Sequence, residues 1–173
     1  MVEVAGIGVL IEGAAGLGKS ETGLGLVKRG HALVADDLTV LRLDSAGKII
    51  ASSMPTTRFF MEIRGLGIIY VPSIFGISSV RGEKELNLVA TLRRPDQVED
   101  LDRSGMTELY RNILGRDIPQ ILIPVAPGRD LVNLVETAAQ DFKLRQMGNF
   151  AAVRLDEQIK EHHLALAQKR GLK

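Results

Sequence analysis

The chain has 173 residues, 45% of them hydrophobic, and its 22 basic side chains nearly cancel its 21 acidic ones. This length fits one compact domain with a sizeable core, and the near-neutral charge gives no support for nucleic acid or an anionic membrane as the main partner. The absence of cysteine excludes disulfides, cysteine-ligated zinc and thiol catalysis. No apolar run approaches the roughly 18 residues of a membrane-spanning helix, so we expect a cytoplasmic protein.

The first part of the chain has the pattern of an α/β unit. Ile7–Ile11 is a nearly continuous apolar run, which predicts a parallel strand buried on both faces. A glycine-rich turn follows it, and then a helix is expected over Ser20–Arg29, ended by Gly30. Ala32–Ala35 is a second apolar strand.

The middle of the chain has shorter and more mixed segments. Leu38–Leu43 and Lys48–Ala51 flank a polar turn and predict a hairpin. Met61–Tyr70 and Leu86–Leu92 each predict a further strand. Arg93–Asp117 is charged and irregular, which indicates loops with short helical pieces.

The last part predicts a strand and two helices. The strand is Ile121–Val125, and a helix is expected over Leu131–Met147 with Asp130 as its cap. A more polar helix is expected over Asp156–Arg170. No internal repeat or linker interrupts the pattern, so we expect one domain over residues 1–173.

A phosphate-binding motif lies between the first strand and the first helix. It matches the pattern G-x-x-x-x-G-K-[ST] and consists of Gly13, Ala14, Ala15, Gly16, Leu17, Gly18, Lys19 and Ser20. Its glycines allow successive backbone N–H groups to face phosphate oxygens at a helix N-terminus, which favours anions. Lys19 can reach the terminal phosphates, and the Ser20 hydroxyl can bind Mg²⁺. The sequence therefore predicts an α/β P-loop domain with a mixed sheet and flanking helices.

Two carboxylates follow the second strand. Asp36 and Asp37 end an apolar run, and ligands in open α/β sheets bind at such strand ends, so we expect this strand beside the P-loop strand. One aspartate can lie near Mg²⁺ while the other accepts a proton from a hydroxyl. A solvated turn with a capping role is the alternative. No Asn-Lys-x-Asp guanine motif occurs, nor any H-R-D or D-F-G element, so a GTPase switch and a eukaryotic-type kinase are disfavoured.

A longer set of segments resembles the HPr kinase/phosphorylase family. The most specific is Met61–Ile69, which reads Met-Glu-Ile-Arg-Gly-Leu-Gly-Ile-Ile. Ser20–Thr22, Lys28–His31 and Pro124–Arg129 agree with the family in order and spacing. The resemblance runs from about Ile7 to Met147.

The resemblance implies roles for individual residues. Lys19 would carry the nucleotide phosphates and Ser20 would bind Mg²⁺, with Asp36 near the metal and Glu62 as a second magnesium ligand. Asp37 would accept the proton in phosphorylation and donate it in dephosphorylation. For Glu62 the alternative is an exposed strand residue.

Further residues are implied in the catalytic step and in the reverse reaction. Arg103 falls on the family's catalytic arginine, although a solvated arginine is the alternative in so charged a loop. Pro124, Gly128 and Arg129 fall in the segment tied mainly to dephosphorylation. For Arg64 the alternative is a structural role, paired with a carboxylate.

The implied activity is bifunctional. ATP or pyrophosphate would phosphorylate a serine of HPr, the phosphocarrier of the sugar phosphotransferase system, and inorganic phosphate would remove the group again. The implied assembly is a homo-hexamer. A P-loop kinase of a small hydroxylated metabolite and a non-enzymatic ATP-sensing module remain the alternatives.

The chain also departs from the family pattern. Ala14 and Ala15 stand where the family usually has Asp-Ser, and Gly23 and Gly25 replace better helix formers at a cost of about 1 kcal/mol each. The family's N-terminal domain and a catalytic histidine before the P-loop strand have no counterpart here.

Overall fold

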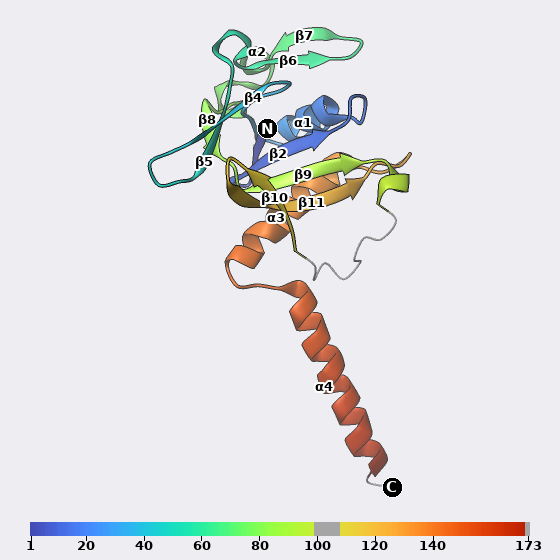
Figure 1. The fold of residues 1–173 in the computed structure, drawn as a ribbon. Coiled ribbons are helices and arrows are strands. Elements are labelled where there is room, and N and C mark those ends of the chain that lie inside the picture. The colour runs from blue at the N-terminus through green and yellow to red at the C-terminus, as the bar shows by residue number, and fades with distance from the viewer. Residues whose placement is uncertain (99–107, 172–173) are drawn as a thin grey trace.

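The computed structural model describes residues 1–98 and 108–171 (Figure 1). Its centre is a six-stranded sheet in the order β10-β11-β9-β2-β1-β3. The strands are β1 (Val2–Val4), β2 (Ile7–Gly13), β3 (Ala32–Leu33), β9 (Leu88–Arg93), β10 (Leu109–Ile113) and β11 (Arg116–Pro124). β2, β9 and β11 pair in parallel and the other pairs are antiparallel, which confirms the expected mixed sheet.

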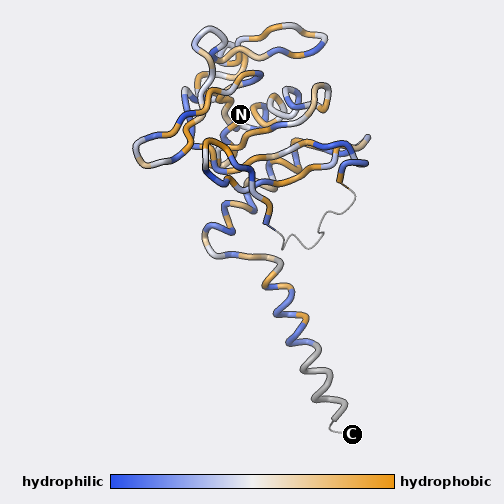
Figure 2. The backbone as a smooth tube through the Cα atoms, in the orientation of Figure 1, coloured by the Kyte–Doolittle hydropathy of each residue, from blue (hydrophilic) through white to orange (hydrophobic). Residues whose placement is uncertain are grey.

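Two helices cover one face of this sheet. α1 (Lys19–Lys28) and α3 (Leu131–Gln146) pack with β2 and β9 in one core cluster that contains Val9, Leu26 and Val135. This arrangement follows from the continuous apolar runs of the central strands, which Figure 2 shows as hydrophobic stretches.

A smaller sheet covers the other face. It contains β4 (Thr39–Leu43), β5 (Ile49–Ser53) and β8 (Glu83–Glu85), in the order β4-β5-β8. The predicted hairpin is therefore confirmed, and its Ile49 and Ala51 pack with Leu10 of β2 in a second cluster.

The remaining elements lie at the periphery. They are α2 (Val71–Phe75), α4 (Ala151–Gly171) and the 3-10 turns η1 (Pro55–Thr57), η2 (Ile77–Ser79) and η3 (Pro95–Gln97). Figure 1 shows α4 projecting away from the sheet. None of the helices in the described part of the chain is long and apolar enough to span a membrane.

The single strand expected over Met61–Tyr70 is wrong, because the segment folds into a hairpin. β6 (Phe60–Ile63) and β7 (Gly67–Tyr70) pair in antiparallel fashion, and the Leu66 N–H donates to the Ile63 carbonyl across the turn at 3.0 Å. Gly65 in the turn has a φ of +84°, a left-handed conformation that side chains disfavour.

Two further expectations need correction. The irregular segment Arg93–Asp117 contains β10 and the start of β11, which form a hairpin around Leu114 and Gly115. β3 pairs with β1 and not with the P-loop strand β2, since β1 lies between them. Both neighbouring pairs are antiparallel, so β3 still runs in the same direction as β2 and ends at the same edge of the sheet.

The two glycines of α1 are positions of close packing. A Cβ on Gly25 would lie 2.4 Å from Cγ2 of Val132 on α3. A Cβ on Gly23 would lie 3.3 Å from Cε of Met61 on β6. The helix α1 that follows the P-loop thus lies between α3 on one side and β6 on the other.

Candidate active site

The phosphate-binding loop joins the end of β2 to the start of α1. Gly13 has a φ of +148°, and a Cβ there would lie 2.7 Å from the backbone oxygen of Leu92. Gly18 is the N-cap of α1 in a left-handed conformation, with a φ of +87° and no side-chain capping bond. The loop therefore needs glycine at both fixed positions, and the first N–H groups of α1 are left for an anion.

Lys19 lies over this loop. Its Nζ donates to the Ala14 carbonyl at 3.1 Å, so the ammonium group is already at the mouth of the cradle. The Thr22 hydroxyl donates to the Gly18 carbonyl at 2.7 Å and fixes the first turn of α1. A phosphate at the loop would meet both a positive charge and aligned N–H groups.

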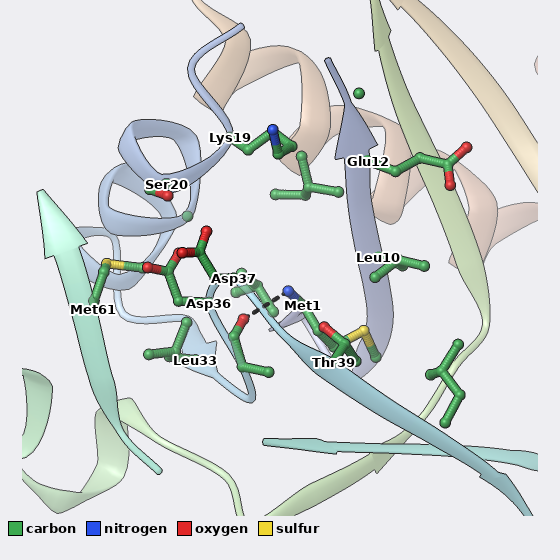
Figure 3. Close-up of a pocket in the computed structure, with 16 residues that line it drawn as sticks. Met1, Leu10, Glu12, Lys19, Ser20, Leu33, Asp36, Asp37, Thr39 and Met61 are labelled. Atoms are coloured by element: carbon green, nitrogen blue, oxygen red, sulfur yellow. Dashed lines mark hydrogen bonds between the residues drawn. The ribbon is translucent and has the colours of Figure 1, made fainter. Parts of the chain in front are cut away.

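Asp36 and Asp37, which follow β3 after two further residues, differ in environment. Asp36 is half-buried and accepts from the Glu62 N–H at 3.0 Å and from the Ser20 hydroxyl. Burial raises the pKa of Asp36 above its usual value, although these hydrogen bonds oppose the shift. Asp37 is exposed. Figure 3 shows both carboxylates on the side of the cavity that faces Ser20.

Two neighbouring cavities meet at these residues. One of about 260 Å³ lies between β2 and β4, and a second of about 240 Å³ lies against the P-loop and β6. Lys19, Ser20 and Asp37 line both, and Glu62 and Arg64 line the second. The structure thus brings the P-loop, the exposed Asp37 and the β6 segment around a common space.

Glu62 contributes both its backbone N–H and its side chain to the site. Its backbone N–H holds Asp36, whereas its exposed carboxylate lines the second cavity. Arg64 lines the same cavity and forms no ion pair with a carboxylate among the described residues, so the structural alternative for Arg64 has no partner there.

The donors for a magnesium ion are few. Within residues 1–98 and 108–171, no three His, Cys, Asp or Glu side chains gather into a cluster that could hold a metal. Mg²⁺ at a phosphate needs only one or two protein oxygens, because phosphate oxygens and water complete its octahedron. The Ser20 hydroxyl and the Asp36 carboxylate lie together beside the P-loop, and these oxygen donors fit that requirement.

The segment predicted for dephosphorylation lies at the same edge of the sheet. Pro124 ends β11 opposite Arg93 of β9, and β9 ends beside Gly13. Gly128 turns the chain with a φ of +80°, and the Arg129 guanidinium donates to the Pro124 carbonyl at 3.1 Å. Arg129 is exposed and does not line either P-loop cavity. Arg103 lies outside the described residues.

A hydrogen-bonded group next to the P-loop escaped the sequence analysis. Glu12 directly precedes Gly13, and its Oε1 accepts from the buried Thr91 hydroxyl at 2.8 Å. Gln120 in turn donates to Thr91 at 2.7 Å. Figure 3 shows Glu12 pointing away from the two aspartates. The sequence feature that could have indicated this group is Glu12 itself, a carboxylate at the end of an otherwise apolar strand.

Comparisons with known proteins identify relatives of the chain. The family described as HPr Serine kinase C-terminal domain matches residues 1–159. The HPr kinase/phosphorylase of Halalkalibacterium halodurans is 43% identical over 161 residues, covering 93% of this chain and 52% of that protein. The protein of the same name from Bacillus mycoides is 43% identical over 159 residues, covering 92% and 52%.

A solved structure gives the same result. The Hpr(Ser) kinase/phosphatase from Coxiella burnetii superposes with a TM-score of 0.78 and 36% identity, covering 94% of this chain and 93% of that one. The chain spans about half the length of the curated relatives that it matches.

Proposed function

The chain belongs to the HPr serine kinase C-terminal domain family, and on this premise we propose that it phosphorylates a serine of HPr with ATP and removes the phosphate by phosphorolysis. The observation that carries the proposal is the shared space beside the P-loop. Lys19 at the phosphate cradle and the exposed Asp37 line the same two cavities. A carboxylate in this place can act on a hydroxyl that attacks a bound phosphate.

The forward reaction assigns a task to each residue. The P-loop amides and Lys19 hold the phosphates of ATP in line with the incoming serine oxygen. The serine oxygen forms a bond to the γ-phosphorus while the bond to the β-bridging oxygen breaks and ADP leaves. Asp37 takes the serine proton, because Asp36 is already engaged by the Glu62 N–H and Ser20. Arg103, by resemblance to the family, would stabilise the transferring group.

The reverse reaction uses the same groups. An oxygen of inorganic phosphate attacks the phosphorus of phosphoserine, the bond to the serine oxygen breaks, and pyrophosphate forms. Asp37 returns a proton to the departing serine oxygen. The loop of Pro124, Gly128 and Arg129, at the same edge of the sheet, would hold the attacking phosphate. An arginine suits this task because its planar fork binds two phosphate oxygens.

Ser20 and Asp36 would hold Mg²⁺, with Glu62 as a further magnesium ligand. The ion supplies neutralisation of the negative charge on the phosphates. The family resemblance further supports pyrophosphate as an alternative donor, a homo-hexameric assembly and a cytoplasmic location.

The exchange Asp37→Asn tests the proposal. HPr is incubated with ATP and Mg²⁺, phosphoserine is measured by mass spectrometry, and ATP affinity is measured by calorimetry. The variant should bind ATP as the wild type does but transfer phosphate about 10²–10⁴-fold more slowly. Asp36→Asn is the matched control for the neighbouring carboxylate.

Other outcomes would reject the assignment. If the wild type phosphorylates small hydroxylated metabolites and not HPr, the protein-kinase proposal is wrong. ATP binding without transfer to either substrate would make the chain an ATP sensor. Full activity of Asp37→Asn combined with an inactive Asp36→Asn would reverse the roles of the two aspartates.

A further inference from the structure

Glu12 has no task in the mechanism above, yet it lines the cavity of about 260 Å³ next to the P-loop. Figure 3 shows Glu12 on one side of this cavity and the two aspartates on the other. The Glu12 side chain is 28% exposed, so its carboxylate is neither fully solvated nor sealed in the core. A negative charge directly before Gly13 repels the phosphates that the loop binds, so this carboxylate works against the cradle beside it.

A chain of hydrogen bonds holds the carboxylate in place. Gln120 Nε2 donates to Thr91 Oγ1 at 2.7 Å, and the Thr91 hydroxyl donates to Glu12 Oε1 at 2.8 Å. The three residues lie on the neighbouring strands β11, β9 and β2, and Thr91 is only 2% exposed. This chain occupies one oxygen of Glu12, and no residue that the structure describes donates to the other, Oε2. The carboxylate is thus oriented through one oxygen and keeps the second for another donor.

Arg111 on β10 is a weak partner for this charge. Its Nε lies 3.9 Å from Glu12 Oε1, which is beyond hydrogen-bonding distance, and its side chain is 55% exposed. Exposed ion pairs of this kind contribute little and are screened by salt. A better-placed cation can therefore compete with Arg111 for Glu12.

The cavity itself favours a cation. Among the described residues that line it, the charged side chains are Lys19 and the carboxylates Glu12, Asp36 and Asp37. The Met1 amino group also lines it, but burial lowers the pKa of that group to about 6, so it is mostly uncharged at neutral pH. Once phosphates engage Lys19, the remaining wall presents carboxylates to the incoming substrate. A substrate with a positive charge close to its hydroxyl is therefore complementary to this wall.

We propose that Glu12 is a specificity-determining residue that receives a lysine or arginine side chain of the protein substrate, close to the serine that is phosphorylated. The proposal rests on the function proposed above, in which a protein serine is presented to Asp37. Basic side chains have long, flexible stems, so one beside the serine can extend across the cavity to Glu12. Its cationic group would donate to Oε2, the oxygen that the Thr91 hydrogen bond leaves available.

The exchange Glu12→Gln tests the proposal, because glutamine keeps an oxygen that accepts from Thr91 and removes only the charge. The KM for HPr should rise roughly tenfold with little change in kcat, since a partly buried charge pair across the interface is lost. The affinity for ATP, measured by calorimetry, should stay the same or increase, because a charge that repels the phosphates is removed. Equal losses of ATP affinity and HPr recognition would overturn the proposal and make Glu12 merely structural.

Charge reversal provides a sharper test. Basic residues of HPr near the target serine are replaced one at a time by glutamate, and one of these HPr variants should become a poor substrate of the wild type. Glu12→Arg should phosphorylate that HPr variant better than it phosphorylates unmodified HPr, because the two reversed charges attract each other again. If Glu12→Arg rescues none of the HPr variants, the proposal is wrong.

Two matched variants separate the charge from its surroundings. Thr91→Val keeps the charge and removes the hydrogen bond that orients it, so the KM for HPr should rise less than in Glu12→Gln. The double variant should be no worse than Glu12→Gln alone, because Thr91 acts through Glu12. Arg111→Gln removes the competing cation and should not raise the KM for HPr. A rise as large as that of Glu12→Gln would show that the pair with Arg111 is what matters, and would overturn the proposal.

A binding measurement separates this proposal from the proposed function. If the wild type does not phosphorylate HPr, the proposed function fails, and fluorescence anisotropy with the ADP-loaded protein decides the role of Glu12. The probes are two labelled serine peptides that differ only in a lysine or a norleucine beside the serine. Tighter binding of the lysine peptide by the wild type, with the difference lost in Glu12→Gln, would support the proposal. Equal binding of the two peptides, or no binding of either, would overturn it.

Discussion

The two glycines of α1 should respond in opposite ways to the same substitution. Alanine at either position should gain about 1 kcal/mol of helix propensity. At Gly25 the new methyl would meet Val132 Cγ2 at 2.4 Å and Cγ1 at 3.2 Å. Valine is short and has one strongly preferred rotamer in a helix, so α3 itself must shift. Overpacking of this kind costs typically about 1–3 kcal/mol, so Gly25→Ala should destabilise the fold by roughly 0–2 kcal/mol.

Gly23→Ala provides the matched comparison. Its methyl would lie 3.3 Å from Cε of Met61 and 3.8 Å from Cγ2 of Val2. The end of a methionine side chain moves easily, so most of the helix gain should remain. We expect Gly23→Ala to stabilise the fold by about 0.5–1 kcal/mol.

Urea unfolding followed by circular dichroism measures both free energies of unfolding. Val132→Ala in the Gly25→Ala background should relieve the contact, so the two changes should be coupled by about 1–3 kcal/mol in a double-mutant cycle. If Gly25→Ala stabilises the protein as much as Gly23→Ala, or if no coupling to Val132 is found, α1 and α3 are not in the close contact described.

Two more predictions concern the carboxylates of the site. Glu62→Gln should raise the Mg²⁺ concentration for half-maximal phosphorylation, because a charged oxygen ligand is lost while the shape is kept, and an unchanged magnesium titration would leave Glu62 without a metal role. Asp36→Asn should alter the pH dependence of stability. Burial raises the pKa of Asp36 in the folded state. The stability that the wild type gains from Asp36 is therefore present below the pKa of the unfolded state and is lost as the pH rises through the pKa of the folded state. Thermal melts between about pH 3 and pH 7 should show the wild type losing stability relative to the variant, and parallel curves would contradict this sign.

The sequence predicted those parts of the fold that depend on local patterns. The P-loop motif, the apolar run of β2 and the Asp130 cap each act over a few residues, and all three are found where expected. The prediction of one strand over Met61–Tyr70 missed the β6–β7 hairpin, although Gly65 and Gly67 in its middle are residues typical of a turn. β10 was missed because Tyr110 and its neighbours are exposed on an edge strand and do not alternate in hydrophobicity.

The site was predictable to a similar degree. Lys19, Ser20 and Asp37 could be found from motif and strand end, and the structure places them around shared cavities. Contacts between distant segments could not be found. His31 and Glu136 are 105 residues apart, and no pattern in either segment names the other as its partner. The hydrogen bond between Glu62 and Asp36 likewise depends on how β6 docks, which a local pattern does not encode.

The parallel pairing of β2 with β9 also has a consequence for how the molecule is assembled. β2 can pair with β1 through a tight turn as soon as both are synthesised, but its other edge requires β9, and Glu12 and Thr91 across that edge are 79 residues apart. Closing so long a loop costs conformational entropy before any contact rewards it. The part of the phosphate-binding loop in which Gly13 packs against the backbone of Leu92 therefore forms late. A nascent chain released from the ribosome before β9 would carry the complete phosphate-binding motif and still lack the surface that shapes it.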